Sequence, residues 1–284
     1  MKQVLVICWL ILSIFSSLAQ RDLTPGKKRG AAFGAVDFNN YKYSGIQVTG
    51  GLIYTKTRSD ANNSMYSIVD GADRPIDYTF DPSGKVGFFI EAGMAHFPKK
   101  QSKLSKIVRT ILVSYYDWGL GLKLINGAEN VTANYYNLGG QVISTLNETS
   151  TFSNAYLYGR FSAHRNFYLG KKYFIDNGIG INADFRFLSS STNDVNTTTF
   201  EPLGNHSPFV LQLNYSLGFG IKLSRRSFLI PSVALPIVGL HDWRSGCAAL
   251  KWYHSNYVPI QAQVKWIYLF KKVQKGCPAV YTTD

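Results

Sequence analysis

Residues 172–188, KYFIDNGIGINADFRFL, alternate between apolar and polar positions along their whole length. Ile179 and Phe185 occupy odd-numbered positions, which are mostly apolar, and Asp176 occupies an even-numbered position, where polar residues are common. Successive side chains of a β-strand point to opposite faces, so this period of two predicts a strand with one apolar and one polar face. Residues 209–223, FVLQLNYSLGFGIKL, repeat the pattern.

The length of these strands favours a barrel that spans a membrane. Each segment has about 15 residues, roughly three times the mean strand of a globular protein, whereas a membrane-spanning strand needs about 9–11 residues plus overhang. Pro231 and Pro236 predict a bulge or bend in the weakest strand, because proline cannot donate to a ladder. Six further segments show the alternation: 44–56, 85–97, 108–125, 154–167, 227–240 and 257–270. We therefore predict an all-β fold, an eight-stranded antiparallel up-and-down transmembrane β-barrel.

The connections between these segments alternate in length. Long connections are expected on the outer side of such a barrel and short turns on the periplasmic side. In chain order they are long (57–84), medium (98–107), long (126–153), short (168–171), long (189–207), short (224–226) and long (241–256). The long ones are rich in loop-forming residues, as in the segments 59–64, 147–151 and 189–194.

A soluble sandwich or a lipocalin-like barrel is the alternative interpretation of the same alternation. In those folds the apolar face points inward and the polar face outward. The glycine pairs Gly178/Gly180 and Gly218/Gly220 would then lie on the solvent face, where charged residues are usual. In a narrow membrane barrel they would lie in the crowded lumen, which is the arrangement we favour.

The start of the chain is typical of an exported protein. Lys2 precedes an apolar run at 4–15, and Ser17-Leu18-Ala19 matches a signal-peptidase site. We therefore expect a signal peptide at 1–19, a periplasmic lead-in at 20–43, the barrel at 44–270, a periplasmic tail at 271–284, and location in the cell outer membrane. Removing the signal peptide, which contains one basic and no acidic residue, lowers the net charge from +13 to +12.

Composition narrows the class of protein further. The chain is 45% hydrophobic and 17% charged, which excludes a disordered polar chain. After residue 19 there is no apolar run of about 20 residues, so helical membrane spans are not expected. The histidines and cysteines lack metal-ligand spacing and no nucleotide motif is present, so we predict no cofactor and no metal. Nucleic acid is not an expected partner, because the basic residues are not interleaved with exposed aromatics.

A signal peptide, long alternating strands and the order of short turns and long loops resemble the small outer-membrane β-barrels of Gram-negative bacteria, of the OmpX, OmpA-barrel and PorT-like types. The resemblance covers 44–270 and is architectural, without a diagnostic motif. Such barrels often end on an aromatic residue, whereas here Phe270 is followed by a tail. The resemblance implies an integral outer-membrane protein.

The polar face of each predicted strand is expected to point inward, and these faces carry charges of both signs. Because an unpaired buried charge is unfavourable, we expect these groups to pair across the lumen. The predicted lumen salt-bridge network contains Glu91, Asp117, Lys123, Arg160, Asp176, Asp184, Arg186, Lys222 and Lys265, with His164 beside them. This pattern suits a plugged, rigid barrel better than a proton or ion path, because eight strands leave little room for a channel.

Basic residues gather at the predicted periplasmic end. This basic collar contains Lys99, Lys100, Lys103, Lys106, Lys171, Lys172, Arg225, Arg226, Lys271 and Lys272. Lysine and arginine near headgroups attract anionic lipid, so outer-membrane lipids are the first expected partners. Docking of other envelope proteins on the turns and tail is the second. Residues 99–112 fit either a basic interfacial helix or an extension of the following strand.

One cluster of residues raises the question of catalysis. His241, Asp242, His254 and Ser255 belong to the last long loop, where a hydrolase acting on lipid A or peptides would have its site. His254 and Ser255 are adjacent, however, so in a strand they point to opposite faces and cannot act together as base and nucleophile. Cys277 in the tail is either inert or able to bond a partner.

Three functions remain open from the sequence. We expect a non-enzymatic outer-membrane barrel with a plugged lumen, acting as a structural or accessory subunit of an envelope assembly or secretion complex. The alternatives are an outer-membrane hydrolase and a narrow passive pore.

Overall fold

The computed structural model describes residues 41–57, 64–69, 75–98, 113–169, 172–192, 208–240, 250–252 and 255–271. These residues form eleven β-strands and no helix, so no helix among them is long and apolar enough to cross a membrane. The strands are β1 (Tyr41–Thr57), β2 (Ser64–Val69), β3 (Pro75–Gly84), β4 (Val86–His96), β5 (Tyr115–Tyr136), β6 (Val142–Tyr168), β7 (Tyr173–Thr192), β8 (Phe209–Lys222), β9 (Ser227–Gly239), β10 (Leu250–Trp252) and β11 (Ser255–Lys271).

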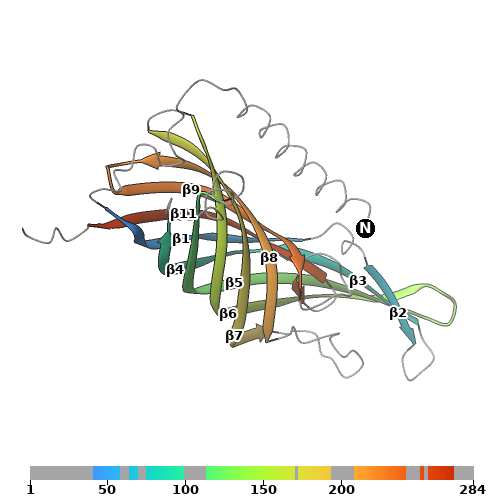
Figure 1. Ribbon diagram of the computed structural model, residues 1–284. Helices are drawn as coiled ribbons and strands as arrows, with labels where there is room; N and C mark the ends of the chain where they lie inside the picture. The colour runs from blue at the N-terminus through green and yellow to red at the C-terminus, as the bar shows by residue number, and fades with distance from the viewer. Residues whose placement is uncertain are drawn as a thin grey trace, which may run out of the picture.

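Eight of the strands close into a ring. They follow one another as β1, β4, β5, β6, β7, β8, β9 and β11, each antiparallel to the next, and β11 pairs back with β1 (Figure 1). Closure removes the free edges that an open sheet of this size would expose. The predicted eight-stranded antiparallel up-and-down barrel is confirmed, and each of the eight predicted segments contributes one strand of the ring.

A bulge occurs where the prolines of β9 predicted one. The register between β8 and β9 shifts between Leu213 and Asn214, and Asn214 is the residue opposite Pro236. Pro236 has no N–H to donate, so an unbroken ladder would leave a carbonyl group opposite it without a donor. The bulge interrupts the ladder at this point.

The two faces of the ring have opposite chemistry. Leu120 and Phe88, on the outer face, are 60% and 59% exposed, whereas Asp117 and Lys265, on the inner face, are 0% and 1% exposed. Apolar side chains therefore cover the outside and the buried charges lie inside, which is the reverse of a water-soluble barrel. The alternation of the sequence thus correctly predicted that the apolar face of the strands points outward and the polar face inward.

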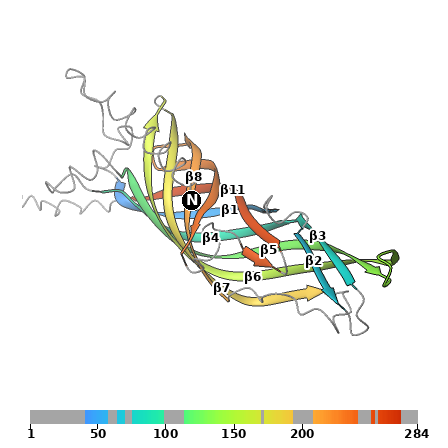
Figure 2. The same cartoon turned by 90° about the vertical axis from the view of Figure 1, so that its right-hand side faces the viewer.

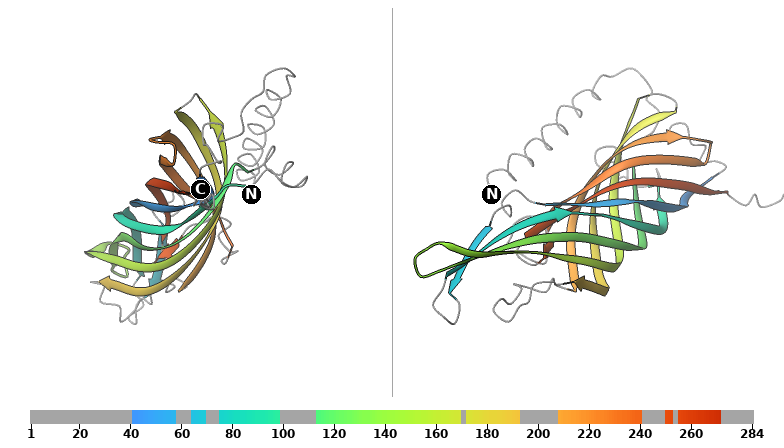
Figure 3. Two further views of the ribbon diagram at one scale, coloured as in Figure 1. Left: turned by 60° about the vertical axis from the view of Figure 1, so that its left-hand side comes forward. Right: turned by 180° about the vertical axis from the view of Figure 1, so that it is seen from behind.

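Beyond the barrel, β5 and β6 continue as a long hairpin to the turn at 137–141, and β3 and β2 pair alongside β5 (Figures 2 and 3). We name this part, residues 64–69, 75–84 and 126–153, the extension. The prediction that 57–84 and 126–153 are loops was wrong for these residues, and 189–192 likewise belong to β7. Polar residues hold the extension together through cross-strand side-chain hydrogen bonds: Thr132 to Asn147, Thr145 to Asn134 and Thr149 to Asn130, each 2.9 Å.

Candidate functional site

The lumen is the only part of the described chain where ionisable groups from many strands converge, and apolar layers lie at both of its ends. The turn end, where β8 is followed by the turn 223–226, has a buried cluster of Ala95, Phe97, Tyr115, Phe174, Phe228, Ile230, Ile267 and Leu269. The loop end, from which the extension projects, has a second cluster of Ile53, Phe89, Ile125, Phe152, Tyr156, Tyr158, Leu250, Trp252 and Tyr257. The charged groups lie between them, in an interior that an eight-stranded barrel fills with side chains.

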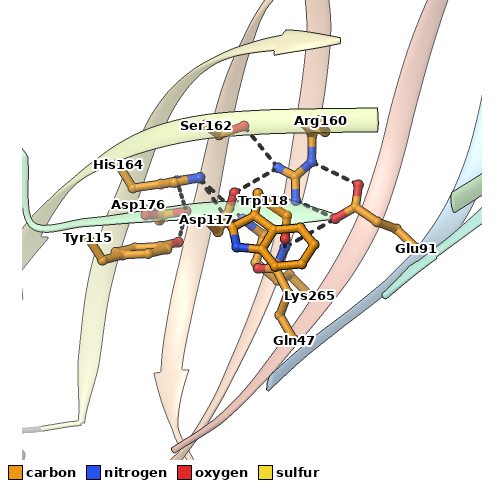
Figure 4. A network of polar contacts seen from close by, with 10 residues as sticks. All are labelled: Gln47, Glu91, Tyr115, Asp117, Trp118, Arg160, Ser162, His164, Asp176 and Lys265. Carbon is orange, nitrogen blue, oxygen red and sulfur yellow. Dashed lines mark hydrogen bonds and ion pairs between the residues drawn. The ribbon is translucent and has the colours of Figure 1, made fainter. Parts of the chain in front are cut away.

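Arg160 on β6 is the centre of the charged layer (Figure 4). Its Nε and Nη2 donate to the two carboxylate oxygens of Glu91 on β4, at 2.8 and 2.5 Å. This two-pronged contact matches the planar fork of guanidinium and is the strongest form of ion pair. Nη1 lies 3.5 Å from Asp117 Oδ1 on β5, and Lys265 Nζ on β11 donates to Asp117 Oδ2 at 2.5 Å. One chain of contacts therefore joins four strands across the lumen.

His164 extends the layer toward β7 (Figure 4). Its Nδ1 lies 3.0 Å from Asp176 Oδ2 and its Nε2 lies 3.3 Å from Asp117 Oδ2, so each ring nitrogen faces a carboxylate. Lys265 Nζ also lies 3.3 Å from Nε2. The imidazole stacks on the ring of Tyr115 at 4.4 Å, and the Tyr115 hydroxyl donates to Asp176 at 3.1 Å. Glu91, Asp117 and Asp176 thus meet Arg160, Lys265 and His164.

A second ion pair lies nearer the loop end. Lys123 Nζ on β5 lies 2.8 Å from both oxygens of Asp184 on β7, and Gln212 Nε2 donates to Asp184 at 3.3 Å. The Lys123 ammonium also lies 4.4 Å from the centre of the Tyr158 ring, within cation–π range. The pair joins β5 and β7 across the inner face of β6, the strand between them, rather than running along one ladder.

Glycines on the inner face make room for these side chains. A Cβ added to Gly119 would lie 2.6 Å from Glu91 Oε1, and one added to Gly178 would lie 2.6 Å from His164 Cε1. Both positions would overlap the charged layer, so the interior has no free volume at these points. The inward glycine positions inferred from the alternation are therefore places where a larger neighbour fills the lumen.

Gly178→Val is expected to lower the free energy of unfolding by about 1–3 kcal/mol, because the added methyl groups displace His164 from Asp176. Urea unfolding of the protein in micelles, followed by tryptophan fluorescence, measures the change. Gly50→Val is the matched control, since the nearest atom to an added Cβ there is the Phe89 carbonyl oxygen at 3.6 Å. Equal losses from both substitutions would contradict the crowded lumen.

Two residues of the predicted lumen network lie apart from the carboxylates described above. Arg186 on β7 packs over the ring of Trp252 on β10, 5.8 Å from its centre, in the loop-end cluster. Lys222 is half-buried at the last residue of β8, where its amide N–H donates to the Lys172 carbonyl. The structure brings the other seven, Glu91, Asp117, Lys123, Arg160, Asp176, Asp184 and Lys265, together with His164, into the contacts given above.

Inner residues outside the predicted network of charges also line the lumen. Tyr115 has the same parity as Asp117, which could have identified it as an inner residue. Gln47 donates to Glu91 at 3.2 Å and Ser162 accepts from Arg160 at 3.2 Å, and both also share the parity of their strand's inner face. Trp252 could not be found this way, because β10 is too short to show alternation.

The predicted basic collar is described only in part. Lys172, Arg225, Arg226 and Lys271 lie at the turn end, where the Arg226 guanidinium is 4.5 Å from the centre of the Tyr268 ring on the outer face. Lys99, Lys100, Lys103, Lys106, Lys171 and Lys272 lie outside the described residues, as do 99–112 and Cys277.

The cluster that was considered for catalysis is likewise described only at Ser255. This serine begins β11, is fully buried, and donates its hydroxyl hydrogen to the carboxylate of Glu129 on β5. The contact ties the paired strands β10 and β11 to the base of the extension. His241, Asp242 and His254 lie outside the described residues. Within the described part of the chain, no cluster of side chains could hold a metal ion.

Fold and interior together define a closed eight-stranded β-barrel with an apolar outside and a layer of buried charges inside. No model of a known protein family matches the sequence, and no curated protein matches it. Among solved structures, the outer membrane protein OprG from Pseudomonas aeruginosa is 12% identical with a TM-score of 0.32, and the match covers 82% of this chain and 97% of that one. The outer membrane protease OmpT from Escherichia coli is 8% identical with a TM-score of 0.26, covering 80% and 96%. Both TM-scores are low, so the fold assignment rests on the strand pairing of this chain.

Proposed function

We propose that the protein is an integral outer-membrane β-barrel that conducts no ions and acts as a structural or accessory subunit of an envelope assembly rather than as an enzyme. The observation that carries the proposal is the reversed burial of the strands. Leu120 and Phe88 are exposed on the ring's outside while Asp117 and Lys265 are buried within it. A lipid environment satisfies the first and a closed interior the second.

The filled interior favours an anchor over a pore. The contacts among Glu91, Arg160, Asp117 and Lys265 cross the lumen, and an apolar cluster lies on each side of them. Breaking such a buried network leaves charges without partners, which is strongly unfavourable. A barrel held in this way keeps its shape and presents its turns and the extension as fixed surfaces.

Planar-bilayer recording tests the closed lumen. We expect almost no conductance from the purified barrel, because the layered side chains leave no continuous water path through eight strands. A sixteen-stranded porin reconstituted in the same lipid is the positive control. Steady single-channel steps from the pure protein would instead support the passive pore.

The accessory role has a separate test. Extraction of the outer membrane in a mild detergent is expected to co-purify the protein with larger envelope proteins. Recovery of a monomer alone, with lipid only, would contradict an accessory subunit and leave the barrel as a simple anchor. Measurements of lipid A acylation and proteolysis before and after His241→Ala and His254→Ala would reveal a hydrolase as a change in either activity.

A further inference from the structure

The extension ends on one side in a strand edge that no other described strand covers. Its strands follow the order β2, β3, β5, β6. From Val142 to Ser150, β6 pairs only with β5, because β7 joins β6 at Thr151 and continues toward the barrel. Val142, Ile143 and Leu146 on this edge are 53%, 58% and 43% exposed.

An uncovered strand presents a row of backbone donors and acceptors. In an antiparallel pair, every second residue directs its N–H and C=O away from the neighbour, so the outer side of 142–150 offers groups for another strand. Natural edges are usually blocked by proline, lysine, a bulge or great shortness. The sequence VISTLNETS has no proline or lysine, and its register with β5 is unbroken from Ser144 onward.

This edge is also held in a fixed shape. Thr145, Asn147 and Thr149 are each hydrogen-bonded to a β5 side chain, and β3 and β2 pair behind β5. A partner that binds here does not have to order the strand first, which lowers the free-energy penalty of binding.

We infer that the edge of β6 from Val142 to Ser150 is a docking site for an extended peptide segment of a partner protein, which adds to the sheet as an antiparallel strand. Main-chain hydrogen bonds would provide the affinity, and alternate side chains the selectivity. The uncovered edge does not depend on a closed lumen, because it lies outside the barrel, whereas the choice of a partner segment over a second copy of this chain rests on the proposed insertion in a membrane.

The two faces of the edge define the chemistry of the segment. Leu146 and Glu148 lie on the same face as Ala133 and Val131, which are their partners on β5, whereas Thr145 and Asn147 lie on the other face. A fitting segment therefore alternates apolar residues with small hydroxyl or amide residues. Glu148 is the only charged residue in 142–150, so a basic residue opposite it is favoured.

A second copy of the chain fits this edge less well. Antiparallel pairing of β6 with β6 would relate the two molecules by a two-fold axis perpendicular to the sheet. Since β5 and β6 run without interruption from the barrel into the extension, the two barrels would then point in opposite directions (Figure 3). Two copies in one membrane cannot adopt that arrangement.

The test uses a fluorescent nine-residue probe, VIKTLNETS, which is the sequence of 142–150 with Ser144→Lys. The probe pairs antiparallel with its leucine opposite Leu146, which places its lysine opposite Glu148. The threonine before that leucine then lies opposite Asn147, and the asparagine after it lies opposite Thr145. Anisotropy titration of the full-length protein in micelles is expected to show saturable binding. N-methylation of alternate probe residues is expected to weaken binding by more than about tenfold for one parity and little for the other, because only one parity faces β6.

A charge exchange checks the direction and register. Glu148→Lys is expected to weaken binding of the lysine probe by about two- to fivefold, and a probe with glutamate in place of that lysine is expected to recover it. Asp81→Lys, on β3 and away from the edge, is the matched control. The inference is overturned by absence of saturable binding, by equal effects of both N-methylated probes, by failure of the charge exchange, or by a concentration-dependent dimer that the probe dissociates.

Discussion

Arg160→Met is expected to lower the free energy of unfolding by about 3–5 kcal/mol, the usual range when one partner of a buried ion pair is removed. Methionine keeps much of the side-chain volume, so the loss reports charge rather than a cavity. Glu91 is 2% exposed and accepts two hydrogen bonds from the guanidinium, both of which the substitution removes, while the Gln47 amide remains as a donor to it.

Urea unfolding in micelles measures the change, with cold and boiled SDS gels as a second indicator of the folded barrel. Arg165→Met is the matched control: Arg165 lies on the same strand, but with outward parity, and its guanidinium is 5.7 Å from the centre of the Phe167 ring. We expect that control to lose at most about 1 kcal/mol, as for a cation–π contact on the outer face of a protein.

A double substitution distinguishes the net stability that the Arg160–Glu91 pair contributes from the penalty of leaving Glu91 without its partner. If Glu91 is unfavourable only because its partner is gone, Arg160→Met combined with Glu91→Leu should be more stable than Arg160→Met alone. Simple addition of the two single losses would contradict this coupling. The same comparison shows whether the ion pairs add net stability or mainly select the arrangement of strands in which they all fit.

The direction of the side chains could be predicted from sequence, because a period of two is a property of the single strand. Asp176 and Asp184 lie on the same face of β7 in any sheet. Gly178 and Gly180 lie on that face too, and because glycine pairs are unusual on a solvent face, they indicated that this face points inward. Which residues pair is a different matter. Asp184 lies against Lys123, two strands away, and that contact depends on the stagger of the closed ring, which no single strand encodes.

The extension shows what the alternation missed and why. Ile76, Tyr78 and Phe80 alternate with polar residues, so a signal for β3 was present. The segment around Asn147 has the composition of a loop, and its strand is stabilised by hydrogen bonds to Asn134 and Thr132 that exist only once β5 lies beside it. Arg186 was placed inside correctly by parity, but its neighbour Trp252 comes from β10, a strand too short to predict.

Leu120→Arg is expected to destabilise the barrel in lipid by about 2–4 kcal/mol, the range for arginine on the lipid face near the bilayer midplane. Leu120 lies on the outer face of β5 midway along the barrel, opposite Ala92 on β4 and Gly159 on β6. Its exposed fraction of 60% would make the same change nearly neutral in a water-soluble protein, where surface substitutions usually stay within about 0.5 kcal/mol. The two environments therefore predict results that differ several-fold.

Urea unfolding from phosphatidylcholine vesicles measures the effect, with Leu138→Arg as the control. Leu138 is 84% exposed in the turn 137–141 at the tip of the extension, beyond the barrel, where arginine meets water in either case. A large loss at 120 together with no loss at 138 requires a medium around the ring that rejects charge. Equal, small effects at both positions would mean that water surrounds the apolar outer face, and neither the lipid-embedded barrel nor the anchoring role built on it would stand.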